Sequence, residues 1–401
     1  MNTALEPKPS ADVAPESAGL WKIAWRQLRR KRMAMACLGI LAVYIVAWLY
    51  AEVVYWRPRI HNQFNKNTSP ITPSYKHSDY ERRNRPPDWA CSLASDLYGC
   101  ADIQREKTAA KTAWAELDKL GLANQATRAK TDEATRKKLE AAGHTALLAK
   151  AYGYQWRWFG TNFAGRDNLQ QLLQGTRIAF EIAILTSLLV IPFGFVMGAM
   201  AGYFGRRTDS SVVYVYSVVD SIPSLLLIMV IAYVMRNAID GSASLQDFNR
   251  FFDSGLVAVC IGMAFTGWVG LCRLIRAEYM KHRDRQYVLA ARSLGASHAS
   301  VMFRHIAPNV SHLIIINFSL RFPGLILTEA LLSYLGVGIA SEPSWGAIIN
   351  DAKQRLYLGN WWELAGATLA MFFLVLALNL FGDALRDALD PKLRTAEGRT
   401  G

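Results

Sequence analysis

Four ionisable side chains stand out inside the long apolar stretches of this 401-residue sequence, where charge is costly. Glu181 lies near the start of one stretch, Asp220 lies in YSVVDSIPSLLL, and Arg321 and Glu329 lie in SLRFPGLILTEALL. The last two are eight residues apart, about two helical turns, so we expect them on a similar face. Asp220, Arg321 and Glu329 are therefore candidates for the lining of a polar path, and structural ion pairs or anchors at a subunit joint are the alternative.

The sequence lacks the residue patterns that ATP hydrolysis, metal binding or catalysis by a Ser/His/Asp triad would need. The sequence holds no G-x-x-x-x-G-K-[ST] phosphate cradle, so we expect no ATP hydrolysis through a P-loop. Residues 101–153 have no His/Cys cluster with metal-ligand spacing and no Ser/His/Asp order, and His144 is expected at the surface. The sequence thus predicts no catalytic residue, no metal site and no cofactor in this chain. The formal net charge is +13, but basic residues are not interleaved with aromatics on a soluble face, so nucleic acid is not an expected partner.

Long apolar runs must position these side chains. A helix needs about 20 apolar residues to cross the ~30 Å hydrocarbon core, and the alternating ten-residue strands of a barrel are absent. The sequence therefore predicts an all-α polytopic membrane protein with six transmembrane helices. The six runs are Met33–Val54, Ile178–Phe204, Ser211–Met235, Gly255–Ile275, Val310–Gly338 and Trp361–Gly382.

The first run is a permanent span rather than a cleaved signal, because it exceeds twenty residues and ends in WLYAEVVYWRPR. Lys and Arg gather before this span and in the loops after the second and fourth spans, so these segments and both termini are expected in the cytoplasm. The predicted parts are a cytoplasmic tail (1–32), the first span (33–55), an extracytoplasmic insert (56–165), a transmembrane core (166–382) with a cytoplasmic loop (276–309), and a C-terminal tail (383–401).

The insert is predicted to be irregular in its first half and to form two short helices in its second half. One helix ends at Gly121, and the other begins at a Thr131 cap. Cys91 and Cys100 are the cysteines of the insert, and an oxidising compartment favours a disulfide between them; two free thiols are the alternative. After the insert, Asp167 predicts the cap of a helix that lies at the outer interface and leads into the second span, and residues 341–360 predict one short surface helix.

The cytoplasmic loop contains RQYVLAARSLGASHASVMFRHIAPN, from Arg285 to Asn309. Gly295 stands where a helix end needs a left-handed residue, Ser297 can start a second helix, and Pro308 is expected to end it. A spacing of i, i+3, i+4 and i+7 predicts an exposed apolar face on the first helix, made of Tyr287, Ala290, Ala291 and Leu294. This segment is either a docking site for a partner protein with acidic residues around its cleft or an amphipathic helix at the lipid surface.

The same segment closely resembles the EAA loop of binding-protein-dependent ABC importer permeases of the dipeptide/oligopeptide/nickel branch. Further stretches resemble this family in the same order, covering the first span and about 160–394. They are GTNFAGRD (160–167), AGYFGRRTD (201–209), ILTEALLSYLGVGI (326–339), PSWGAIINDA (343–352) and LNLFGDALRDALDPKLR (378–394). Two departures are Leu289, which stands where the family has glutamate, and the insert, which is longer than the usual outer loop.

The resemblance implies a C-type permease subunit in the bacterial inner membrane. Its implied partners are a similar permease, two cytoplasmic ATPases that bind ATP and Mg²⁺, an outer substrate-binding protein and membrane lipid. Small peptides are the implied cargo, with nickel chelates or other solutes as alternatives. The residues expected to couple to the ATPases are Arg285, Tyr287, Ala290, Ala291, Gly295, His305, Pro308 and Asn309.

Two other functions remain open from the sequence. A self-sufficient secondary transporter would be expected to show inverted repeats and paired intramembrane carboxylates, and no internal repeat is evident. A membrane-anchored sensor or scaffold would use the insert and would need neither a pore nor a motor. The insert itself could contact a binding protein, cap an outer vestibule or be a passive addition.

Overall fold

A computed structural model describes residues 25–26, 28–29, 31–64, 76, 84–93, 100–129, 133–153, 157–241, 253–339 and 342–389. These residues form helices, with one isolated bridge between Thr161 and Asp167. The outer insert contains α3 (Asp88–Leu93), α4 (Cys100–Lys119), α5 (Ala123–Ala129), α6 (Glu133–Ala141) and α7 (Thr145–Gly153). The remaining elements are α2 (Arg32–Phe64), α8 (Asn168–Phe204), α9 (Arg206–Asp220), α10 (Ser224–Asp240), α12 (Ser254–His282), α13 (Gln286–Ser293), α14 (His298–Ser300), η4 (Val301–Ile306), α15 (Ala307–Tyr334), α16 (Trp345–Lys353), η5 (Leu356–Leu358) and α17 (Trp362–Leu389).

Five helical segments are long and apolar enough to cross a membrane: the parts of the chain at 32–59, 168–204, 254–282, 298–334 and 361–389. The predicted third span differs, because α9 and α10 form a pair bent by 89°. The bend follows Asp220, the last residue of α9, and Pro223 precedes α10. Proline has no backbone N–H to donate and disfavours helix at the residue before it, which accounts for the break. Counting the bent pair as one span gives the six that the sequence predicts.

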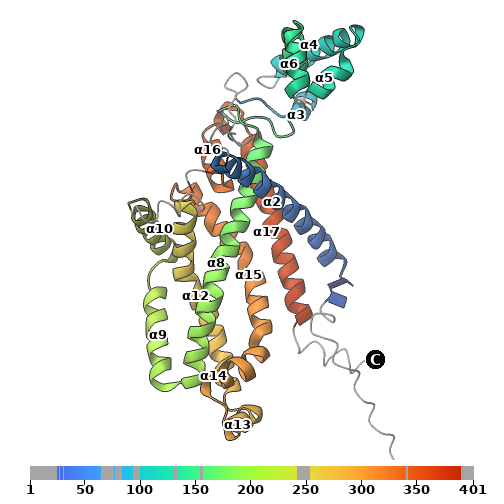
Figure 1. Ribbon diagram of the computed structural model, residues 1–401. Helices are drawn as coiled ribbons and strands as arrows, with labels where there is room; N and C mark the ends of the chain where they lie inside the picture. The colour runs from blue at the N-terminus through green and yellow to red at the C-terminus, as the bar shows by residue number, and fades with distance from the viewer. Residues whose placement is uncertain are drawn as a thin grey trace, which may run out of the picture.

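The spans α8 and α12 pack with their backbones in close contact, and three glycines of α8 allow it. Gly194, Gly198 and Gly202 recur every fourth residue and face α12. A Cβ atom on Gly198 would lie 2.6 Å from the Cys272 carbonyl oxygen, and one on Gly202 would lie 2.5 Å from the Arg276 carbonyl oxygen. Small residues at this spacing let two backbones approach in a membrane, where dispersion contacts replace the hydrophobic effect. Figure 1 shows α8 and α12 side by side, with α15 beside them.

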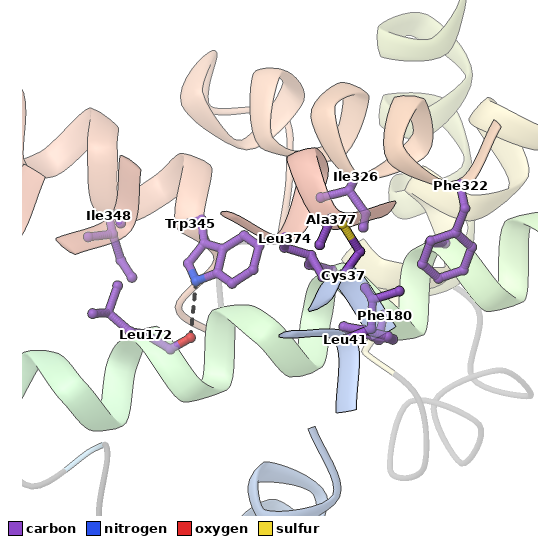
Figure 2. Packing of buried hydrophobic residues seen from close by; sticks show 13 residues of the cluster. Cys37, Leu41, Leu172, Phe180, Phe322, Ile326, Trp345, Ile348, Leu374 and Ala377 are labelled. Atoms are coloured by element: carbon purple, nitrogen blue, oxygen red, sulfur yellow. Dashed lines mark hydrogen bonds between the residues drawn. The ribbon is translucent and has the colours of Figure 1, made fainter. Parts of the chain in front are cut away.

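The outer ends of the spans are joined by Trp345, which is fully buried at the start of α16. Its indole Nε1 donates to the Leu172 carbonyl oxygen of α8 at 3.0 Å, as Figure 2 shows. A Cβ on Gly175 would lie 2.4 Å from the indole ring, so glycine is needed there. The segment predicted as a surface helix is thus partly buried, and the tryptophan joins α16 to a core shared by α2, α8, α15 and α17.

The helix after Asp167 is not a separate interfacial helix. Asp167 caps it as predicted, accepting from the Leu169 backbone N–H at 2.9 Å, but the helix continues for 37 residues as α8. At 1.5 Å per residue α8 is about 55 Å long, so its first turns extend beyond the hydrocarbon core. Leu172 is buried in the shared core, which explains why this apolar face does not lie on lipid.

The insert has more helices than the two that its sequence suggests. Its described second half contains α4 to α7: α4 ends at Lys119, next to the predicted end at Gly121, and α5 follows it. Gly143, which adopts positive φ, lies inside the second predicted helix and separates α6 from α7. Thr131 lies outside the described residues. Leu117, Leu139 and Leu148 share a small apolar core, and Cys91 and Cys100 are joined by a disulfide. In Figure 1 these helices lie at the end of the molecule opposite α13.

We expect Gly198→Val to separate α8 from α12, because the added side chain meets backbone and cannot be accommodated by a rotamer change. The apparent melting temperature of the purified protein should fall by several degrees, as expected for overpacking that costs about 1–3 kcal/mol. The control is Met200→Val, since Met200 is exposed on the same helix. Equal melting temperatures for both variants would show that the contact of α8 with α12 is not tight.

Candidate coupling loop and translocation cavity

The cytoplasmic loop folds into two helical pieces around a left-handed glycine. The first piece is α13, and Gly295 follows it with φ +82°, as its place in the sequence predicts. The Ser297 hydroxyl then accepts from the Ser300 backbone N–H at 3.3 Å and begins the second piece. No atom lies within 4 Å of a Cβ built on Gly295, so its backbone conformation, not lack of space, requires glycine.

The exposed apolar surface of α13 differs from the predicted face. Ala291 is only 7% exposed and packs inward with the fully buried Val288. Leu289 is 49% exposed and Leu294 is 89% exposed. The prediction that Ala291 belongs to an exposed face is therefore wrong, because the short helix turns that side toward the ends of the spans. Leu289 and Leu294, together with the exposed Ala290, provide the outward apolar surface.

Three tyrosines attach the loop to the spans. Tyr203 of α8 pairs its hydroxyl with His298 Nδ1 at 2.9 Å, and Tyr279 of α12 donates to the Met302 carbonyl oxygen at 3.0 Å. The Tyr287 hydroxyl lies 2.8 Å from Nδ1 of His282, at the end of α12. Burial raises the pKa of Tyr287, although a hydrogen bond with Asn309 and the charge of Arg285 act in the opposite direction. The loop is thus fixed to α8 and α12 by hydrogen bonds as well as by apolar contacts.

Pro308 does not end the second helix, contrary to the prediction. It lies in the first turn of α15, directly after the π-helical segment η4 that contains His305. A proline inside a helix would clash with the carbonyl group four residues earlier, and the wider π turn relieves this clash. Asn309 Nδ2 donates to the His305 carbonyl oxygen at 2.8 Å. One helical segment therefore runs without interruption from His298 to Tyr334.

A cavity of about 550 Å³ at the outer end brings the 160–167 segment together with the segments 326–339 and 343–352, which lie far from it in the sequence. Asn162 and Arg166 come from the 160–167 segment, Ser333 from 326–339, and Asn350 and Asp351 from 343–352. All three segments are among those that resemble the permease family. Stretches that resemble the family at separate points of the sequence therefore line the same cavity.

A second cavity, of about 470 Å³, lies between α8, α9, α10, α12 and α15, and we refer to it as the central cavity. Its wall combines apolar and polar side chains, and each of the five helices adds at least one polar side chain. These polar side chains are Ser187, Asp220, Ser224, Thr266, Arg273, Asn317, Arg321 and Thr328. A cavity in which polar groups converge among apolar side chains is typical of a binding site for a small solute.

Two of the three predicted path residues meet in the central cavity. Asp220 ends α9 at the bend, and it forms an ion pair with Arg273 of α12 at 2.7 Å. Arg321 comes from the middle of α15 and donates from Nη1 to the Gly267 carbonyl oxygen. Their common position supports a role in a path, which stays a prediction.

Glu329 does not reach the central cavity. It is 1% exposed, and its carboxylate accepts from the Ser333 hydroxyl at 2.7 Å, one turn further along α15. Eight residues advance a helix by about 800°, so Glu329 is rotated by about 80° from Arg321. The expectation that the two side chains share a face is therefore wrong, and the helical repeat explains the error.

The sequence reasoning missed Arg273, Asn317 and Thr328, although a periodic signal was present. Asn317, Arg321, Gly324 and Thr328 follow one another at i, i+4, i+7 and i+11 in an otherwise apolar span, and all four line the central cavity. The search for charged residues alone overlooked this polar stripe.

The loop and most residues of the central cavity lie in a part of the chain that matches a known protein family. Residues 191–395, just over half of the chain, match the model of the family described as binding-protein-dependent transport system inner membrane component. Residues 19–87 match the model described as the N-terminal TM domain of oligopeptide transport permease C. The helices α3 to α7 of the insert lie between the two matched ranges.

Relatives agree with these matches. The dipeptide transport system permease protein DppC of Bacillus subtilis is 32% identical over 59% of this chain and 69% of its own length. The oligopeptide transport system permease protein OppC of the same organism is 34% identical over 59% and 72%. The glutathione transport system permease protein GsiD of Pectobacterium atrosepticum is 33% identical over 59% and 73%.

We expect Gly295→Val to disturb the loop more than Gly295→Asn, because asparagine tolerates the left-handed conformation and a β-branched residue does not. In inside-out vesicles, trypsin should cleave the valine variant faster at Arg292, while the asparagine variant should stay close to the native rate. Equal cleavage rates for the two variants would contradict a fixed left-handed backbone at this position.

Proposed function

The chain belongs to the family of binding-protein-dependent transport system inner membrane components, and on this premise we propose how its two sites work together. It is a multi-pass permease subunit of an ABC importer in the bacterial inner membrane. The proposal is that a second permease subunit completes the path, two cytoplasmic ATPases drive it, and an outer binding protein delivers a small peptide. Membrane lipid surrounds the spans.

The observation that carries this proposal is that the same two helices hold both sites. The inner ends of α8 and α12 bind the loop through Tyr203 and Tyr279. Further along, the same helices line the central cavity with Ser187 and Arg273. Because the glycine-mediated contact keeps α8 and α12 together, a displacement of the loop moves part of the cavity wall with it.

The motor acts on the outward surface of the loop. Leu289, Ala290 and Leu294 are exposed at the cytoplasmic end, where a cleft of an ATPase can cover them. Closure of the ATPases on ATP would then shift α13 and tilt α8 and α12 against the second permease. A rigid-body movement of this kind opens the central cavity alternately to the two sides of the membrane.

Energy for transport comes from the partner subunits. ATP and Mg²⁺ bind to the ATPases in this proposal, and the permease chain acts without catalysing a reaction. The lack of a P-loop motif in the sequence supports this division of work. Among the described residues, no group of three His, Cys, Asp or Glu side chains is arranged to hold a metal ion.

Peptides are the proposed cargo for two reasons. Dipeptide, oligopeptide and glutathione transport appear in the names of the relatives, which are 32–34% identical to this chain. The central cavity also offers charged groups of both signs together with neutral amides and hydroxyls, which suits a small zwitterion with a polar backbone. The insert, held by the Arg85–Glu106 ion pair at 2.6 Å, lies on the outer side, where the delivering protein would approach.

The direct test is uptake by the purified complex. A tag on this chain should co-purify a second permease and ATPase subunits. Proteoliposomes containing this complex and the binding protein should take up a labelled dipeptide only with ATP, and vanadate should stop uptake. Uptake by this chain alone, driven by an ion gradient, would contradict the proposal and would favour a secondary transporter.

We expect Leu294→Asp to weaken the binding of the ATPases to the loop. The side chain is 89% exposed, so the substitution should leave folding and membrane insertion unchanged, but it places a charge in an apolar contact. ATP-driven uptake should fall by at least about tenfold, the effect of losing ~1.4 kcal/mol of binding. Leu120→Asp is the matched control, because Leu120 is 52% exposed but lies in the insert. Normal uptake with Leu294→Asp would exclude this residue from the contact.

A further inference from the structure

Arg321 is a cation inside a span, and the described part of the chain gives it no carboxylate. Its Nη1 donates to the Gly267 carbonyl oxygen, an uncharged acceptor, and no described Asp or Glu oxygen lies within the 4.0 Å of an ion pair. The neighbouring arginines differ. Arg273 has Asp220 at 2.7 Å, and Arg276 has Asp209 as a bidentate partner.

The surroundings hold the Arg321 guanidinium at the wall of the central cavity. Gly270 lies directly beneath it, since a Cβ there would stand 3.3 Å from Nη2. Asn317 and Thr328 lie one and two turns away on the same side of α15 and also line the cavity. Because the side chain is only partly buried and Nη2 has no hydrogen-bond acceptor among the described residues, an anion in the cavity can reach it.

An unpaired guanidinium at membrane depth is unfavourable unless water or an anion compensates its charge. The cost falls when a carboxylate enters, because guanidinium and carboxylate form short, charge-assisted hydrogen bonds of matching planar geometry. An entering carboxylate faces the same problem of lost hydration. The two groups therefore stabilise each other only while cargo is in the cavity, which suits a transient site.

We propose that Arg321 is the subsite for the C-terminal carboxylate of the peptide cargo during its passage through the permease. This inference rests on the proposed function, because it assumes that peptides pass through the central cavity. It assigns a specific role to one residue: Arg321 favours cargo with a free carboxyl end. Asp220 cannot take this role, since it carries the opposite charge and already pairs with Arg273.

The test compares two forms of one tripeptide, with a free C-terminal carboxylate and with a C-terminal amide. ATP-driven uptake is measured in proteoliposomes holding the complete importer, at concentrations that saturate the binding protein with each form. Arg321→Gln should lower uptake of the free acid about tenfold, the effect of one lost charge-assisted contact, and should change uptake of the amide less than about twofold. Glu329→Gln is the control, because Glu329 is buried away from the cavity, and it should change neither.

A second variant covers the case in which Arg321→Gln fails to assemble. Arg321→Lys keeps the charge but loses the planar fork, so it should lower uptake of the acid by about threefold and leave the amide unaffected. An equal loss for acid and amide in either variant would overturn the proposal and indicate a counter-carboxylate on the second permease. Unchanged uptake of both forms would also overturn it. Absence of ATP-driven uptake in the native complex would instead count against the proposed function.

Discussion

The low polarity of the hydrocarbon core is the constraint on which the rest of the structure depends, because a charge inside it must be compensated by a neighbour. The chain satisfies this constraint by using ion pairs to connect helices. Arg177 of α8 is only 3% exposed and lies between Glu181 at 3.0 Å and Glu52 of α2 at 3.8 Å. At the cytoplasmic ends of the spans, Arg276 joins α12 to Asp209 of α9.

These pairs also explain where the bundle opens. Arg273 and Asp220 compensate each other yet remain 47% and 54% exposed, so their pair borders space that this chain does not fill. The central cavity lies at that border, on helices whose outward side chains are large and apolar, such as Phe318 and Leu327. A second permease subunit would cover this face and close the path from the other side.

The loop is connected mechanically to the central cavity by tight packing at two levels along α8 and α12. Near the middle, glycines let α8 and α12 approach until their backbones touch. At the cytoplasmic end, an apolar core that includes Ile275, Val288 and Ile306 joins the loop to those helices. Tight cores respond to a push as one body rather than by local deformation. The loop, α8 and α12 are therefore suited to move together.

Run length and helix-end residues made most of the fold predictable from the sequence. The spans follow from apolar runs, the start of α8 from Asp167, and the end of α13 from Gly295, since each depends on local chemistry alone. The inward position of Ala291 depends on tertiary contacts, because the helical repeat alone does not tell which side of α13 faces the spans. Proline marks where the helix breaks between α9 and α10 and where the π turn lies, but it does not set the 89° angle of the bend.

The candidate site was predictable only in part, for a similar reason. Charge within a span marked Asp220 and Arg321, but charge alone does not tell a cavity wall from a buried structural position, as Glu329 shows. Asn317 and Thr328 are neutral, so only their helical spacing from Arg321 along α15 indicates that they line the cavity. Arg273 also lies inside a predicted span, Gly255–Ile275, so its charge was a signal in the sequence, but its pairing with Asp220 follows only from the folded chain.

Alternating exposure of the central cavity is tested most directly by labelling Thr328→Cys with a membrane-impermeant thiol reagent. The native cysteines give little background, because Cys37, Cys260 and Cys272 are buried and Cys91 and Cys100 are oxidised. In the assembled complex, a path that carries cargo predicts labelling from the cytoplasmic side without nucleotide and from the outer side after trapping with ATP and vanadate. Labelling that is the same in both states would contradict it.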